Sequence, residues 1–132
     1  MKILCLASLL FFSLSVVNAQ NLLKVGTVAP SVAFKTAYQK NYKIPKNKIL
    51  ILDFWATWCG PCVAGLIESN SFVEKYEDKF EYIGITDVTS VNSAQFIKNQ
   101  KFKHKFIYDD GKIYEDFGVT GIPHAYIIDK NG

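Results

Sequence analysis

Arginine is absent from this chain of 132 residues, so all 15 of its basic side chains are lysines. Arginine is the residue best suited to bidentate contacts with phosphate groups and with the edges of nucleic-acid bases. The formal net charge is only +3, which is too small to suggest electrostatic binding to a polyanion. The composition therefore predicts no nucleic-acid partner. The hydrophobic content of 49% is that of a folded globular chain rather than a disordered one.

The chain also lacks an apolar run of the length that crosses a bilayer. The run from Ile3 to Val17 has about 15 residues, whereas a membrane-spanning helix needs about 20. Lys2 precedes this run, and Val17-Asn18-Ala19 ends it with the compact residues that a signal peptidase recognises. We therefore expect residues 1–19 to be a signal peptide that directs export to the periplasm or another extracytoplasmic compartment. An uncleaved membrane anchor is the alternative.

Cysteine is scarce, with three in the chain. Cys5 lies within the expected leader, so the exported chain would keep only Cys59 and Cys62. An exported protein enters an oxidising compartment, where neighbouring thiols tend to form disulfides. A cysteine pair that works there as a dithiol therefore needs a supply of electrons.

Residues 20–132 are expected to form one α/β domain, because segments typical of strands alternate with segments typical of helices. Strands are predicted at Ser31–Thr36, Ile49–Phe54, Phe80–Thr86, His104–Tyr108 and Ala125–Asp129, and helices at Pro61–Lys79, Ser93–Gln100 (capped by Ser90 or Asn92) and Ile113–Phe117. The second strand is apolar almost throughout, as in strands buried on both faces of a sheet. The final Asn131-Gly132 is a tight-turn signal with nothing after it, which predicts an incomplete domain lacking at least an edge strand.

Cys59 and Cys62 lie at the junction between the second predicted strand and the helix that follows it. Their Cα atoms are expected within the ~4.4–6.8 Å range that a disulfide allows. Cys59 should face the unpaired N–H groups of the helix N-terminus, which favour a thiolate and lower a cysteine pKa from about 8.5 to between ~3.5 and 7.5. Cys62, one turn into the helix, should be more buried and less acidic. Cys59 would then attack a disulfide and Cys62 would resolve the product.

Two other interpretations of this cysteine pair fit the sequence less well. A zinc site would need His104 and His124 as further ligands, yet these lie about 20 residues apart rather than the three to five usual in structural sites. A static structural disulfide would close too short a loop to stabilise the fold much. The pattern therefore favours a redox-active dithiol, and it implies neither a metal nor an organic cofactor.

Asp53 places one charge in the otherwise apolar second strand. An unpaired buried charge costs several kcal/mol, so burial should raise the pKa of this carboxyl. A carboxyl beneath the start of the helix could exchange a proton with Cys62. The alternative is that Asp53 caps a loop or pairs with a lysine at the end of the strand.

A second candidate element, Gly121-Ile122-Pro123-His124, precedes the last predicted strand. Proline is tolerated at the first residue of a strand, and a cis bond there would leave the Ile122 backbone free to pair with an extended peptide. The alternative is an ordinary trans proline in a loop. His124 is expected to be a partly exposed strand residue rather than a catalytic one.

The stretch from Asp53 to Cys62, Asp-Phe-Trp-Ala-Thr-Trp-Cys-Gly-Pro-Cys, resembles the active site of thioredoxin, and Gly118 to Pro123 resembles its cis-proline loop. Val28-Ala29-Pro30 and the stretch from Ala125 to Gly132 resemble, more narrowly, the extracytoplasmic TlpA-like thiol–disulfide oxidoreductases. The resemblance extends over residues 25–132. It implies a thioredoxin-like fold, with a central mixed sheet flanked by helices, from which the C-terminal strand and helix are missing.

By this resemblance Cys59 is the exposed nucleophile, Cys62 the resolving thiol and Asp53 the buried carboxylate. The residues that would contact the substrate are Trp58, Gly60, Pro61, Ile122 and Pro123. The Gly-Pro dipeptide between the cysteines suggests a reductant of protein or peptide disulfides. Its regeneration would need a membrane thiol–disulfide electron donor.

Two positions depart from the TlpA-like pattern. Gly65 and Ile67 stand where those proteins often carry a glutamate and a helix-kinking proline. Gly65 and the missing C-terminus favour one alternative function, a non-catalytic binding or scaffold module of a longer protein. A peroxidase is a further alternative, for which the sequence shows no cysteine context of the peroxiredoxin type.

Overall fold

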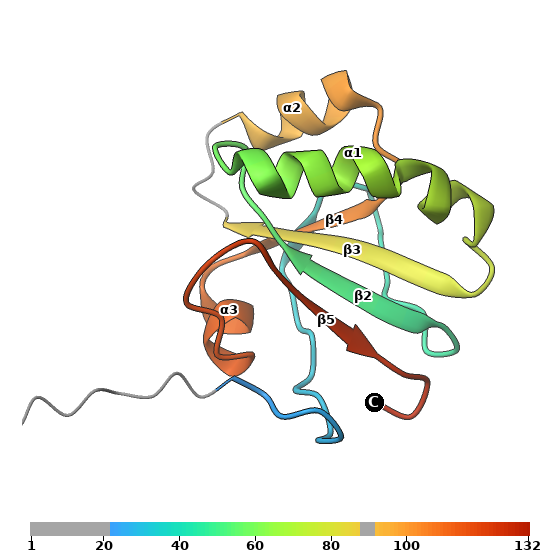
Figure 1. Ribbon diagram of the computed structural model, residues 1–132, viewed down its shortest axis with the longest axis vertical. Helices are drawn as coiled ribbons and strands as arrows, with labels where there is room; N and C mark the ends of the chain where they lie inside the picture. The colour runs from blue at the N-terminus through green and yellow to red at the C-terminus, as the bar shows by residue number, and fades with distance from the viewer. Residues whose placement is uncertain (1–21, 88–91) are drawn as a thin grey trace, which may run out of the picture.

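The structure is a computed structural model that describes residues 22–87 and 92–132. Within these ranges the elements are β1 (Thr36–Ala37), β2 (Ile49–Phe54), α1 (Gly60–Lys75), β3 (Phe80–Asp87), α2 (Ser93–Gln100), β4 (Lys105–Asp109), α3 (Lys112–Asp116) and β5 (His124–Ile128) (Figure 1). No helix in this described part is long and apolar enough to cross a membrane. The expected signal peptide and Ser90 lie outside the described residues.

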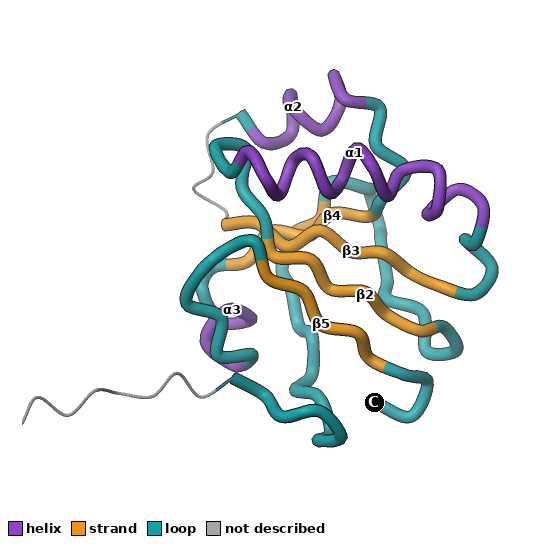
Figure 2. The backbone as a smooth tube through the Cα atoms, in the orientation of Figure 1, coloured by secondary structure: helices purple, strands orange, loops and turns teal. Residues whose placement is uncertain are grey.

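The strands form one mixed sheet in the order β1-β4-β3-β2-β5 (Figure 2). β2, β3 and β4 run parallel, whereas β1 pairs antiparallel with β4, and β5 pairs antiparallel with β2. Parallel neighbours need a crossover connection, and α1 and α2 provide the two crossovers. The α/β class and the mixed sheet predicted from the sequence are confirmed.

The sheet is covered on both faces, and the alternation of side chains along β2 determines which residues lie on each. α1 and α2 lie on one face, and α3 lies on the other (Figure 1). Leu52 and Phe54 are fully buried in the cluster that includes Ile113 of α3. Asp53 lies between these two residues and Trp55 follows them, so both point to the opposite face of the sheet, toward α1. Trp55 is fully buried in the cluster that contains residues of α1 and α2.

One predicted strand has the wrong bounds because tertiary contacts decide them. β1 comprises Thr36–Ala37 rather than Ser31–Thr36, since only these two residues pair with β4. Asn92 is the N-cap residue of α2, as expected, but it has a left-handed conformation and its side chain makes no capping hydrogen bond. The bounds of α2 itself are those predicted.

α1 has Pro61 in its first turn as expected, but it ends at Lys75 rather than at Lys79. Tyr76 leaves helical geometry, and its carbonyl accepts hydrogen bonds from the backbone N–H groups of Lys79 and Phe80. A tight turn therefore replaces the last predicted helical residues and leads directly into β3.

Candidate active site

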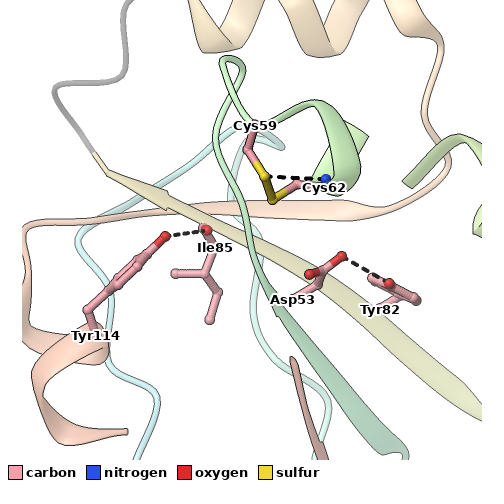
Figure 3. The surroundings of a disulfide bond; sticks show 6 residues. All are labelled: Asp53, Cys59, Cys62, Tyr82, Ile85 and Tyr114. Atoms are coloured by element: carbon pink, nitrogen blue, oxygen red, sulfur yellow. Dashed lines mark hydrogen bonds between the residues drawn. A yellow bond between two sulfur atoms is a disulfide. The ribbon is translucent and has the colours of Figure 1, made fainter. Parts of the chain in front are cut away.

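A disulfide joins Cys59 and Cys62 at the start of α1, with their Cα atoms 5.3 Å apart (Figure 3). This separation lies in the range predicted from the sequence. Cys59 is the N-cap residue of α1, and its Sγ accepts a hydrogen bond of 3.3 Å from the Cys62 N–H group. The sulfur thus lies at a helix N-terminus, where an N–H donor and the positive end of the helix dipole stabilise negative charge.

Both cysteines are buried in this oxidised form, with exposed fractions of 5% for Cys59 and 2% for Cys62. The expectation of an exposed Cys59 is therefore wrong for this state, because both residues belong to the apolar cluster beneath α1. Cys62 is the more buried of the two, as predicted. The exposed surface at the disulfide consists of Trp58, Gly60 and Pro61, and the Trp58 side chain is the largest part of it.

Asp53 lies on the sheet below the disulfide and is 8% exposed (Figure 3). Burial raises the pKa of its carboxyl from 3.8 to about 6, and a hydrogen bond from the Tyr82 hydroxyl acts in the opposite direction. That hydroxyl donates to Asp53 Oδ2 over 3.0 Å. The predicted buried carboxyl with a raised pKa is confirmed. At pH 7 most of this group is ionised and can accept a proton.

The loop before β5 forms part of the wall of a cavity of about 640 Å³. Trp58, Ile122 and Tyr114 of α3 all line this cavity. Ile122 also packs against the cluster that contains both cysteines. The Ile122–Pro123 peptide bond is cis. The structure therefore brings the two candidate elements of the sequence together, whereas His124 lies half-buried on β5.

Over residues 25–132 the sequence matches the AhpC/TSA family. The chain belongs to this family. It is 30% identical over 115 residues to the thiol-disulfide oxidoreductase ResA of Bacillus thuringiensis subsp. konkukian (strain 97-27). This match covers 83% of this chain and 66% of that protein. It is 28% identical over 107 residues to sporulation thiol-disulfide oxidoreductase A of Bacillus subtilis (strain 168), which covers 74% of this chain and 64% of the relative. The chain thus spans about two thirds of the length of these relatives.

Solved structures show the same fold as this AhpC/TSA family member. A thiol:disulfide interchange protein of the thioredoxin family from Chlorobium tepidum TLS has a TM-score of 0.60 at 26% identity, over 66% of each chain. StoA from Bacillus subtilis has a TM-score of 0.58 at 26% identity, over 67% of this chain and 70% of that one. The thioredoxin-like fold and the resemblance to thiol–disulfide oxidoreductases are confirmed.

Within the described residues, the ligands that a zinc site would need do not lie together. In residues 22–87 and 92–132, no three His, Cys, Asp or Glu side chains form a group that could hold a metal ion. His104 is 1% exposed, and its Nε2 lies 2.9 Å from Ser69 Oγ. Burial lowers the pKa of His104 to about 4, so the imidazole is neutral at pH 7.

Reasoning from the sequence missed Tyr82 and Ser69, and it considered His104 only as a zinc ligand. Tyr82 carried one usable signal, because its alternation with Ile83 in a predicted strand places it on the same face of the sheet as Asp53. Ser69 and His104 carried none, since they meet across 35 residues of sequence.

Gly65 and Ile67, the two positions that depart from the TlpA-like pattern, lie within α1, which continues through both. A Cβ atom at Gly65 would meet no atom within 4 Å. The helix surface there is open, and the carboxyl that the structure places below the disulfide is that of Asp53.

Proposed function

We propose that this chain is an extracytoplasmic thiol–disulfide oxidoreductase that reduces the disulfides of protein or peptide substrates. The observation that carries the proposal is the Cys59–Cys62 disulfide at the start of α1, with the carboxyl of Asp53 below it. Relatives named thiol-disulfide oxidoreductases support the reaction class. The apolar leader of residues 1–19 supports export.

The first step starts from the dithiol form of the protein. The Cys59 thiolate attacks one sulfur of the substrate disulfide, so that a bond forms between Cys59 and that sulfur. The substrate S–S bond breaks, and its second sulfur leaves as a thiolate. The N-terminus of α1 and the Cys62 N–H group hold the negative charge on Cys59 before the attack.

The second step releases the substrate. The Asp53 carboxylate accepts the proton of the Cys62 thiol, and the resulting thiolate attacks Cys59 Sγ. The bond between Cys59 and the substrate breaks, and the released substrate sulfur takes up a proton. Two electrons have then passed to the substrate, and the protein holds the Cys59–Cys62 disulfide. A membrane thiol–disulfide electron donor would reduce this disulfide again, in a cycle that uses no metal or organic cofactor.

The proposed substrate surface surrounds the disulfide. It consists of Trp58, Gly60, Pro61, Ile122 and Pro123. Trp58 is 78% exposed, so a substrate side chain can cover it on binding. The backbone of Ile122 would pair with an extended substrate segment, as in strand addition. Such pairing places little demand on substrate sequence, which suits a reductant of several proteins.

Insulin reduction with dithiothreitol as the electron source tests this proposal in the full chain. The wild-type protein should accelerate the reaction, Cys59→Ser should abolish the acceleration, and Cys62→Ser should accumulate a mixed disulfide that mass spectrometry detects. A Cys59→Ser variant as active as the wild type would instead favour the non-catalytic scaffold. A reduction potential at or above about −120 mV, the value of a strong oxidant, would overturn the direction of the reaction.

A further inference from the structure

Two hydrogen-bonded pairs of side chains, Asp53 with Tyr82 and Ser69 with His104, lie next to each other between β2, β3 and α1. The Tyr82 hydroxyl on β3 donates to Asp53 Oδ2 over 3.0 Å. The Tyr82 ring packs edge to face against the His104 ring, and Ser69 Oγ on α1 lies 2.9 Å from His104 Nε2. We refer to Asp53, Tyr82, Ser69 and His104 as the polar network. Three of its four members have no role in the reaction proposed above.

The proton positions at the inner end of the network follow from burial. His104 is neutral at pH 7, because burial lowers its pKa to about 4. Its Nδ1 has no hydrogen-bond partner among the described residues. A buried N–H without an acceptor is rarer in proteins than an unsatisfied acceptor, so we assign the ring proton to Nε2, which donates to Ser69 Oγ. The Ser69 hydroxyl also lies 2.8 Å from the Gly65 carbonyl of α1, so Ser69 is held from two sides.

Packing fixes the ring of Tyr82. It meets the His104 ring edge to face, with centroids 4.5 Å apart and planes at 85°. The His104 ring in turn lies 5.7 Å from the ring of Phe102 and 6.0 Å from that of Phe106. The tyrosine therefore presents its hydroxyl to Asp53 from a ring that cannot turn away freely.

Among residues 22–87 and 92–132, no cationic side chain forms an ion pair with Asp53. On the adjacent strands the residues paired with Asp53 are Gly84 and Ala125, which carry no charge. Cys62 lies above it on α1 (Figure 3). Burial and then the charges of Asp109, Asp87 and Asp53 raise the pKa of Tyr114, which donates its hydroxyl to the Ile85 carbonyl instead.

We propose that Tyr82 is a positioning residue, which holds the Asp53 oxygen that takes the Cys62 proton, and that Ser69 and His104 hold Tyr82 in place. This inference rests on the proposed function, because it gives Asp53 its part in the release step. The hydroxyl of Tyr82 stabilises the ionised form of Asp53. Without this hydroxyl, less of the carboxyl is available as a base at neutral pH.

The experiment follows Asp53 in two ways in the full chain. Carbon-13 NMR measures the pKa of its carboxyl in the oxidised protein, and insulin reduction from pH 5 to 9 gives the pH–rate profile. Tyr82→Phe should raise the pKa of Asp53 by about one unit, since a hydrogen bond to the charged form is lost. The acidic limb of the pH–rate profile should shift to higher pH by the same amount, so the rate at pH 6 should fall about fivefold.

Tyr42→Phe is the matched control, because it also removes a tyrosine hydroxyl that donates to a buried carboxyl. The Tyr42 hydroxyl donates to Glu81 Oε1 over 2.9 Å, on the opposite face of the sheet from Tyr82. This variant should leave the pKa of Asp53 and the profile unchanged. In an Asp53→Asn background, Tyr82→Phe should produce no further shift of the profile.

An unchanged pKa of Asp53 in folded Tyr82→Phe would overturn the inference. If that variant does not fold, Ser69→Ala tests the same network, and a smaller upward shift supports the inference while no shift overturns it. The two proposals fail separately. A wild-type protein without insulin reductase activity would contradict the proposed function. The NMR titration instead measures the effect of Tyr82 on the pKa of Asp53, and it needs no turnover.

Discussion

Asp53→Asn should stabilise the folded protein at neutral pH while it slows the proposed reaction. Asparagine has nearly the shape of aspartate and keeps an oxygen that can accept the hydrogen bond from Tyr82. The substitution therefore removes the charge and leaves the packing almost unchanged. A buried carboxylate is costly when ionised, so the variant should gain the free energy that the wild type loses by keeping this group charged.

The size of the gain follows from the pKa of Asp53, which is 3.8 in its ordinary state and about 6 in the folded protein. A difference of roughly two units corresponds to about 3 kcal/mol. Because the folded pKa is the higher one, the folded form binds more protons than the unfolded form between these values. The contribution of Asp53 to stability therefore falls as the pH rises through about 4 to 6. The advantage of Asp53→Asn should be near zero below pH 4 and about 3 kcal/mol above pH 7.

Urea denaturation of the two oxidised proteins between pH 3.5 and 8 measures this difference in the free energy of unfolding. Asp110→Asn is the control, since Asp110 is an exposed carboxyl whose pKa is lowered by Lys35. Its loss should give no stabilisation at neutral pH. If the free energies of unfolding of the wild type and Asp53→Asn differ by the same amount at pH 8 as at pH 4, the reasoning about Asp53 is refuted. Insulin reduction by Asp53→Asn at pH 7 should be slower by about a hundredfold, the lower end of the usual contribution of a positioned base.

Two further predictions concern packing and acid sensitivity. Gly84→Ala should lower the free energy of unfolding by about 1–3 kcal/mol, because a Cβ there would lie 2.6 Å from Phe106 Cδ1 and 2.9 Å from Trp55 Nε1. Gly65→Ala is the matched control, because a Cβ at this position would meet no atom within 4 Å, and it should raise the free energy of unfolding by up to about 1 kcal/mol. Equal effects of the two substitutions in urea denaturation would contradict the packing described. His104→Phe should gain stability relative to the wild type as the pH falls. The pKa of His104 is about 4 in the folded protein and 6.5 ordinarily, so the contribution of His104 to the free energy of unfolding declines by about 3 kcal/mol as the pH falls from 6.5 to 4. A difference in stability between wild type and variant that stays constant with pH would contradict this prediction.

The sequence predicts those parts of the fold and the site that a local pattern determines. Ile49–Phe54 is recognisable as a strand because a segment buried on both faces is apolar throughout. The same pattern makes Asp53 conspicuous, since a charge in such a strand must be buried with it. Cys59 and Cys62 fall at the start of a helix because Pro61 favours the first helical turn.

The remaining features depend on contacts between distant segments, which leave no local pattern. Ser31–Thr36 has the composition of a strand, yet the pairing partners on β4 decide that only Thr36–Ala37 forms one. Cys59 is buried because residues far along the chain complete its apolar surroundings. Tyr82 and His104 become neighbours only when the sheet has formed.

The opposite displacements of the Asp53 and His104 pKa values, to about 6 and about 4, have a joint consequence. At pH 5 the folded interior holds an uncharged carboxyl and an uncharged imidazole, whereas the unfolded chain has a carboxylate and an imidazolium. Unfolding then transfers one proton between these two groups and exchanges almost none with the solvent, so together they make stability nearly insensitive to mild acid. These two groups therefore do not drive unfolding under conditions that protonate Asp53, the base of the proposed reaction, so mild acid should slow that reaction reversibly.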